Sequence, residues 1–228
     1  MVEVFVLRLP NEKLSTNLKE LLEFLPINQK NKLYGFHFIK DAKLFLCGQL
    51  LVRAIISKYL NINNTDQHFV LNEYGKPYIY GVENFHYNLS HSGNWVVCAI
   101  DQKPVGVDIE KIKPFAPDIA RYYFSAEEFL YMSQAPETVK LGLFYELWTF
   151  KESYIKALGC GLSKPLNSFT IKLVGDGKAR VKDANPKVFF RQYKLNPGYK
   201  LATCCFQNEY DELIKIVDLN WIEARLNE

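Results

Sequence analysis

The sequence predicts an α/β (α+β) fold of two pseudo-symmetric lobes, each a small, mostly antiparallel sheet packed against a long helix. Each half of the chain contains one long apolar run with helical spacing, Asp41 to Leu60 and Phe144 to Leu158, followed by a Lys-Pro pair and then by short strand-like segments. This parallel order predicts an N-terminal lobe over residues 1–104 and a C-terminal lobe over residues 105–228.

Composition and charge limit the class of protein. The 228 residues suffice for one large or two small domains, and 48% hydrophobic with 14% aromatic residues indicates a well-packed chain. A net charge of +3 is too small to favour general nucleic-acid binding. We see no signal-peptide pattern and no apolar run that could span a bilayer, so we expect a cytoplasmic protein whose five cysteines are reduced.

In the N-terminal half, the spacing of apolar residues predicts the helices and strands. A first strand over residues 2–9 carries apolar residues on both faces and should be covered on both. A helix is expected over residues 11–25, closed by Pro26, and the long helix over 41–60 is apolar nearly all round, so it should lie inside its lobe. Further strands are expected over residues 69–71, 88–93, 95–100 and 105–110.

The C-terminal half begins with a helix-start signal. Ser125 and Glu128 form a capping box that predicts a short helix, and the second long helix should end at Gly159. Strands are expected over residues 169–173, 188–193, 200–206 and 213–217, followed by a terminal helix over 218–226.

Charged side chains interrupt the apolar pattern of the second long helix. Trp148, Glu152 and Lys156 stand four residues apart and therefore share one helix face. The many large apolar neighbours should partly remove water from that face, where charges need partners. Taken alone, a Glu and a Lys at this spacing are more typical of a weak surface ion pair.

A second polar feature lies on the strand over residues 105–110. Period-two alternation places Gly106, Asp108 and Glu110 on one face, and two carboxylates so close repel each other unless a cation or solvent separates them. Mg²⁺ is typically held by one or two carboxylates together with waters and substrate phosphates. The pair alone is more typical of a solvated sheet face. Joined to Glu152, it predicts a magnesium site of three carboxylates.

Three motifs in this order and spacing carry a resemblance: Asn88 to Gly93 with Trp95, Gly106 to Glu110, and Trp148 to Lys156 followed by Gly159 and Leu162. Together they resemble the 4'-phosphopantetheinyl transferases of the Sfp type, whose hallmarks are a Gly-x-Asp-x-Glu strand and a Trp-x-x-Lys-Glu-Ser helix. The resemblance extends to residues 73–77 and to parts of 41–53, so it touches most of the chain.

The resemblance implies an activity. Coenzyme A would bind between the two lobes, and its 4'-phosphopantetheine arm would be transferred to a serine of an apo acyl or peptidyl carrier protein, with release of adenosine 3',5'-bisphosphate. The length and the Lys-Glu-Ser form resemble the broad-range type of secondary metabolism, such as nonribosomal peptide antibiotic biosynthesis, and imply a monomer. The sequence does not decide which pathway supplies the acceptor.

The resemblance also implies roles for individual residues. Mg²⁺ would be held by Asp108, Glu110 and Glu152, and coenzyme A phosphates would be contacted by Lys76, Ser90, His91 and Lys156. Glu152, or a metal-bound water that it orients, would accept the serine proton, and Lys156 would assist the leaving phosphate. The basic segment before the first long helix departs from the family pattern. Of Lys30, Lys32 and Lys43, we expect Lys32 and Lys43 to bind the 3'-phosphate.

Two other interpretations of the same residues stay open. The three carboxylates could serve a Mg²⁺-dependent phosphohydrolase that acts with water and no protein acceptor. A non-catalytic carrier-protein-binding module is the alternative from another class, and it predicts that substituting Glu152 leaves partner binding and biological activity intact.

Overall fold

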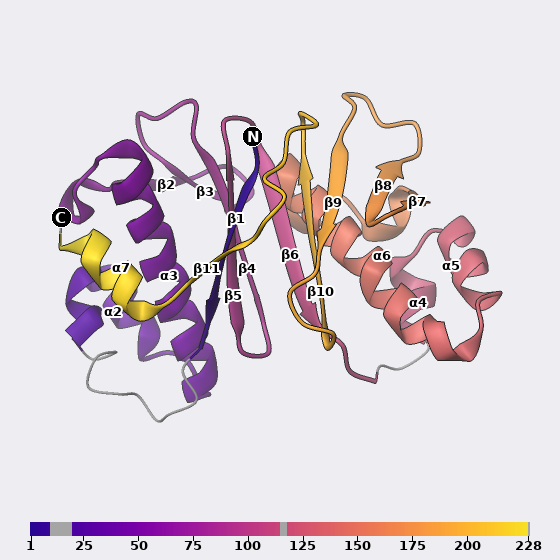
Figure 1. The fold of residues 1–228 in the computed structure, drawn as a ribbon, viewed down its shortest axis with the longest axis horizontal. Coiled ribbons are helices and arrows are strands. Elements are labelled where there is room, and N and C mark those ends of the chain that lie inside the picture. Colours follow the sequence, from indigo (N-terminus) through magenta and orange to yellow (C-terminus); the bar gives the residue numbers. More distant parts are fainter. Residues whose placement is uncertain (10–19, 115–117, 228) are drawn as a thin grey trace.

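The computed structural model describes residues 1–9, 20–114 and 118–227, and its two lobes stand side by side in Figure 1. The first lobe contains β1 (Glu3–Arg8), α2 (Ile27–Leu33), α3 (Ile39–Leu60), β2 (Phe69–Leu71), β3 (Pro77–Ile79), β4 (His86–Ser92) and β5 (Trp95–Asp101). The second contains β6 (Val105–Lys111), α4 (Asp118–Tyr123), α5 (Ala126–Ser133), α6 (Glu137–Leu158), β7 (Ile171–Gly175), β8 (Lys178–Val181), β9 (Phe189–Tyr193) and β10 (Tyr199–Cys205). The chain ends in β11 (Lys215–Val217) and α7 (Leu219–Leu226).

The sheets are small and mostly antiparallel, and the predicted mixed α/β class is confirmed. One sheet has the strand order β11-β1-β5-β4 and the other β6-β10-β9, with two-stranded pairs β2-β3 and β7-β8 beside them. Only the pairing of β11 with β1 is parallel among these sheets of the described residues. The long helices α3 and α6 each pack against one main sheet, as Figure 1 shows.

Strand β1 is buried on both faces, which confirms the prediction for residues 2–9. Its odd-numbered apolar residues, Phe5 and Leu7, contact the core around α3. Its even-numbered residues, Val4 and Val6, join a separate core between the two main sheets. That second core lies between β1 and β5 on one side and β6 and β10 on the other, so buried apolar surface holds the lobes together.

Several segments differ from the expected pattern, and helices α2 and α4 and strands β3 and β8 form where the sequence predicted no element. The helix predicted over residues 11–25 falls mostly outside the described residues, and its described end is a 3-10 turn at Leu21–Phe24. The last segment, β11 with α7, returns to the first lobe, where Ile222 and Leu226 are buried in the core around α3. The predicted division at residue 104 would place β11 and α7 in the C-terminal lobe, although they pack against the first lobe. That division stays a prediction. None of the helices in the described part of the chain is long and apolar enough to cross a membrane.

Gly106 allows α6 to lie directly on β6. A Cβ atom at this position would collide with the Ser153 carbonyl oxygen and the Ala157 amide nitrogen, both backbone atoms of α6. Glycine is therefore required by close approach of two backbones. This contact places the 152–156 segment of α6 over the polar face of β6.

Gly106→Ala is expected to lower the free energy of unfolding by about 3 kcal/mol, because backbone cannot yield as a side chain can. Gly142→Ala, within α6 itself, is the matched control: a Cβ there meets nothing within 4 Å, so higher helix propensity should stabilise the protein by about 0.5–1 kcal/mol. Denaturant melts of both variants check this. Equal effects of the two substitutions would contradict the packing argument.

Candidate active site

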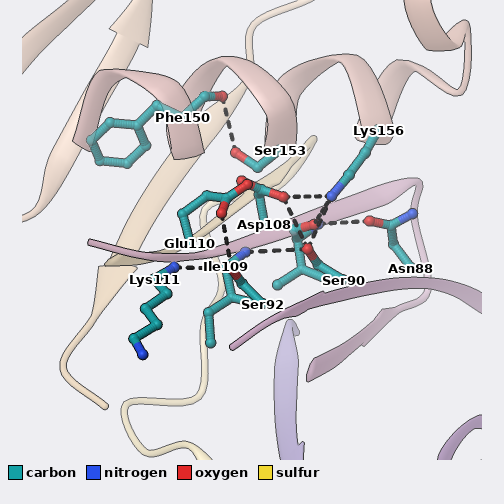
Figure 2. A network of polar contacts seen from close by, with 11 residues as sticks. Asn88, Ser90, Ser92, Asp108, Ile109, Glu110, Lys111, Phe150, Ser153 and Lys156 are labelled. Atoms are coloured by element: carbon teal, nitrogen blue, oxygen red, sulfur yellow. Dashed lines mark hydrogen bonds and ion pairs between the residues drawn. The ribbon is translucent and has the colours of Figure 1, made fainter. Parts of the chain in front are cut away.

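Asp108 of β6 is the centre of a polar cluster at the junction of the lobes (Figure 2). The residue is buried, at 3% exposure, and its Oδ1 accepts hydrogen bonds from Lys156 Nζ at 2.5 Å and Ser90 Oγ at 2.9 Å. Its Oδ2 is buried as well, with no hydrogen-bond partner among the described residues. A buried carboxylate oxygen without a partner is costly, so this atom points to a missing ligand.

Lys156 supplies the positive charge of the cluster from α6. Besides Asp108, its Nζ donates to Ser90 Oγ at 3.1 Å and to the Val107 carbonyl oxygen at 3.2 Å. The side chain retains 26% exposure, so the ammonium can still reach a ligand from solvent. The packing of α6 on β6 therefore brings the Lys156 ammonium against Asp108.

Strand β4 joins this cluster to the first lobe through side chains. Both β4 and β6 are edge strands of their sheets. The backbone N–H groups of Val107, Ile109 and Lys111 donate in turn to Asn88 Oδ1 (2.9 Å), Ser90 Oγ (3.3 Å) and Ser92 Oγ (3.0 Å). Side chains of alternate β4 residues thus accept hydrogen bonds from backbone N–H groups on the open edge of β6, which would otherwise pair with a neighbouring strand. The polar cluster lies on this seam.

Glu110 is the second carboxylate on the β6 face. Its Oε2 accepts a hydrogen bond from Ser92 Oγ at 3.0 Å. Burial, and next the negative charge of Asp108, raise the pKa of Glu110 to about 7, against the weaker opposing effects of Ser92 and Lys156. A carboxyl group whose pKa is raised by burial and by a neighbouring like charge is typical of functional sites.

Glu152 of α6 is the third carboxylate, and it is half-buried. Burial is the main cause that raises the pKa of Glu152, followed by the charge of Asp108, while Lys156 lowers it. Glu152 also contributes to the raised pKa of Glu110. The charges of the three acids therefore influence one another across β6 and α6.

A divalent cation fits these residues chemically. Oxygen ligands suit Mg²⁺, and an added cation would give Asp108 Oδ2 a partner and relieve the repulsion among the carboxylates. Within the described ranges, no cluster of three or more His, Cys, Asp or Glu side chains has its atoms already arranged around a metal position. Magnesium binding at Asp108, Glu110 and Glu152 stays a prediction.

Stability without metal should depend on pH through Glu110. Its pKa of about 7 in the folded chain lies above its ordinary 4.5, so the folded state binds more protons in this range and stability falls as pH rises from about 4.5 through 7. We expect a loss on the order of 1–2 kcal/mol for a half-buried group. Melting temperatures in a chelator against pH should show this fall, and Glu110→Gln should flatten it. A parallel fall in that variant would exclude Glu110 as its source.

Comparison with known proteins gives two adjoining family matches. Residues 104–204 match the 4'-phosphopantetheinyl transferase superfamily, and residues 12–103 match the N-terminal model of 4'-phosphopantetheinyl transferase. The chain is 37% identical over 201 residues to 4'-phosphopantetheinyl transferase Sfp of Bacillus subtilis (strain 168), covering 87% of this chain and 90% of that protein. It is 35% identical to 4'-phosphopantetheinyl transferase gsp of Aneurinibacillus migulanus, covering 90% and 86%.

The chain belongs to the Sfp-type 4'-phosphopantetheinyl transferase family. It is therefore an enzyme of the transferase class. The resemblance drawn from the three motifs is confirmed, and each of those motifs contributes residues to the seam between the lobes.

In this phosphopantetheinyl transferase the predicted coenzyme A residues divide into groups. Ser90 lies at the centre, bonded to Asp108 and Lys156. Lys76 lies next to the cluster, where its Nζ donates to the carbonyl oxygens of Val105 (3.0 Å) and Lys156 (2.6 Å). Burial lowers the pKa of Lys76 to about 8. Lys76 thus holds the last turn of α6 to the start of β6.

His91 does not share the Ser90 face of β4, because successive strand residues point to opposite sides. It is exposed, and partial loss of hydration, then Lys156, lowers the pKa of its ring, while Asp41 opposes the shift. Lys32 and Lys43 lie on α2 and α3, and the Lys32 ammonium is 5.1 Å from the centre of the Phe45 ring. Phosphate binding by these residues stays a prediction.

The sequence interpretation missed two features near the site. Lys151, the lysine of the Lys-Glu-Ser motif, is fully buried in an ion pair with Glu128, which the capping box had indicated only as part of a helix start. Lys200 of β10 pairs with Glu146 of α6 at 3.0 Å. Nothing in the sequence near Lys151 or Lys200 predicts its ion-pair partner, since the paired residues are 23 and 54 positions apart along the chain.

Proposed function

We propose that this transferase moves the 4'-phosphopantetheine arm of coenzyme A to a serine hydroxyl of an apo acyl or peptidyl carrier protein, with Mg²⁺ held by Asp108, Glu110 and Glu152. The observation that carries the proposal is the buried, unpartnered Oδ2 of Asp108 beside Lys156, with two further acids of raised pKa around it. Such a site suits a diphosphate brought together with a cation.

In the proposed reaction the serine oxygen bonds to the phosphorus that carries pantetheine, and the P–O bond to the adenosine-bearing phosphate breaks. Adenosine 3',5'-bisphosphate leaves. A bound Mg²⁺ would polarise phosphate oxygens and offset their charge. Lys156, exposed on one side, would stabilise negative charge on the diphosphate.

Glu152 is the proposed proton acceptor for the serine hydroxyl. Its raised pKa makes it a better base than an ordinary surface glutamate, and its half-buried position leaves it accessible to an incoming side chain. Lys76 acts more remotely in this proposal, because its ammonium already bonds two backbone carbonyls and so fixes α6 relative to β6.

The test is to incubate the protein with coenzyme A, Mg²⁺ and an apo carrier domain and to follow the carrier by intact mass. The expected result is addition of one phosphopantetheine arm, absent with a chelator or with a carrier whose serine is replaced by alanine. Release of phosphate or nucleotide without carrier modification would support the phosphohydrolase alternative. Carrier binding with neither product would support a non-catalytic module.

The proposal also includes a monomeric, cytoplasmic enzyme of secondary metabolism.

A further inference from the structure

Lys200 of β10 stands directly opposite Glu110 of β6. The two residues are partners in the antiparallel register, and such partners project to the same face with Cβ atoms roughly 4.5–5.5 Å apart. This face carries Asp108 and is covered by α6, since the next partners along the ladder are Ala202 with Asp108 and Cys204 with Gly106. A lysine at this position is well placed to bond the Glu110 carboxylate.

The structure shows a different pairing. The Lys200 ammonium bonds Glu146 Oε2 of α6 at 3.0 Å, with side-chain exposures of 22% and 24%. No ion pair joins Lys200 to Glu110 in the described part of the chain, and Glu110 accepts its hydrogen bond from Ser92 instead. Glu146 lies on α6 six positions before Glu152, so one helix carries both a proposed metal ligand and the partner of Lys200.

We propose that Glu146 is a positioning residue that holds Lys200 away from Glu110 and so leaves the Glu110 carboxylate open to Mg²⁺. An ammonium on Glu110 would compete with the cation for the same oxygen lone pairs and would repel it electrostatically. The inference rests on the proposed magnesium site. It assigns a role to an ion pair that touches none of the reacting groups.

The test titrates Mg²⁺ calorimetrically into the full chain with coenzyme A present. Glu146→Gln keeps the shape of the side chain but removes its charge, so Lys200 should turn to Glu110. We expect Mg²⁺ binding to weaken about twofold to fivefold, the range for a partly exposed ion pair. In the transfer assay the half-saturating Mg²⁺ concentration should rise by the same factor, while the rate at saturating Mg²⁺ stays unchanged.

A double substitution separates the loss of the Glu146 charge itself from the release of Lys200 onto Glu110. Lys200→Met removes the competing ammonium and should bind Mg²⁺ at least as tightly as the wild type. Glu146→Gln combined with Lys200→Met should behave as Lys200→Met alone. Glu137→Gln is the matched control, because Glu137 starts the same helix but pairs with Lys140 in an exposed ion pair. It should leave Mg²⁺ binding unchanged.

The inference fails if Glu146→Gln binds Mg²⁺ as the wild type does, or if the double variant is as weak as Glu146→Gln. It also fails if Lys200→Met weakens binding, a check that holds even where Glu146→Gln is poorly folded. If the wild type shows no Mg²⁺ binding that Asp108→Asn removes, the proposed metal site itself is wrong. The two failures are therefore distinguishable.

Discussion

Glu152→Gln is expected to lower phosphopantetheine transfer on the order of a thousandfold while leaving the protein folded and slightly more stable. Glu152 makes no hydrogen bond or ion pair among the contacts of the described residues, and burial together with Asp108 raises the pKa of its carboxyl group. Its unpaired charge therefore destabilises the folded protein, and in our proposal it is kept for the reaction. Losing one proposed metal ligand and the proton acceptor should raise the barrier by several kcal/mol.

Single-turnover transfer by intact mass and thermal melting measure the two effects. Glu137→Gln removes an exposed carboxylate from the same helix and should change neither. A Glu152→Gln variant that transfers at wild-type rate would contradict the site, and one that fails to fold would contradict the claim that the residue has no structural role.

Lys151→Met is expected to reduce the free energy of unfolding by about 3–5 kcal/mol, because it leaves a buried charge without its partner. The Lys151 ammonium is fully buried and donates to both oxygens of Glu128, at 2.6 and 2.7 Å, and to the Phe169 carbonyl oxygen at 2.7 Å. Glu128 further accepts the backbone N–H groups of Ser125 and Ile171. This ion pair connects α5, α6 and the start of β7.

Denaturant melts check this, and the expected loss corresponds to a drop in melting temperature of roughly 10 °C for a chain of this size. Combining Lys151→Met with Glu128→Gln should recover part of the loss, because the stranded charge is then removed. A loss below 1 kcal/mol, or no recovery in the double variant, would show that the ion pair is not what holds these elements together.

The local pattern of the sequence was sufficient for most elements. Period-two alternation predicted that Asp108 and Glu110 share a strand face, and helical spacing predicted that Glu152 and Lys156 share a helix face. The structure has both arrangements, in β6 and α6. Helix α6 begins at Glu137, earlier than the apolar run at Phe144 indicated, because its first turns carry polar residues and face a less buried surface.

The spacing of the motifs also indicated that the β6 carboxylates and the α6 pair Glu152 and Lys156 belong to one site. That β6 and α6 meet in space, however, depends on Gly106, which lets α6 pack directly on β6. Strand pairing was harder. Residues 213–217 were expected as a strand, but nothing local indicated that β11 would return to lie beside β1 in the other lobe.

The sequence by itself determined the two long helices, most of the strands and which side chains share a face along them, since backbone geometry repeats over a few residues. Only the tertiary structure decided the partners: Ser92 for Glu110, Glu146 for Lys200 and Glu128 for Lys151. A charge or hydroxyl bonds whichever group the packing of distant elements brings within about 3 Å, and that distance depends on how sheet edges and helices meet.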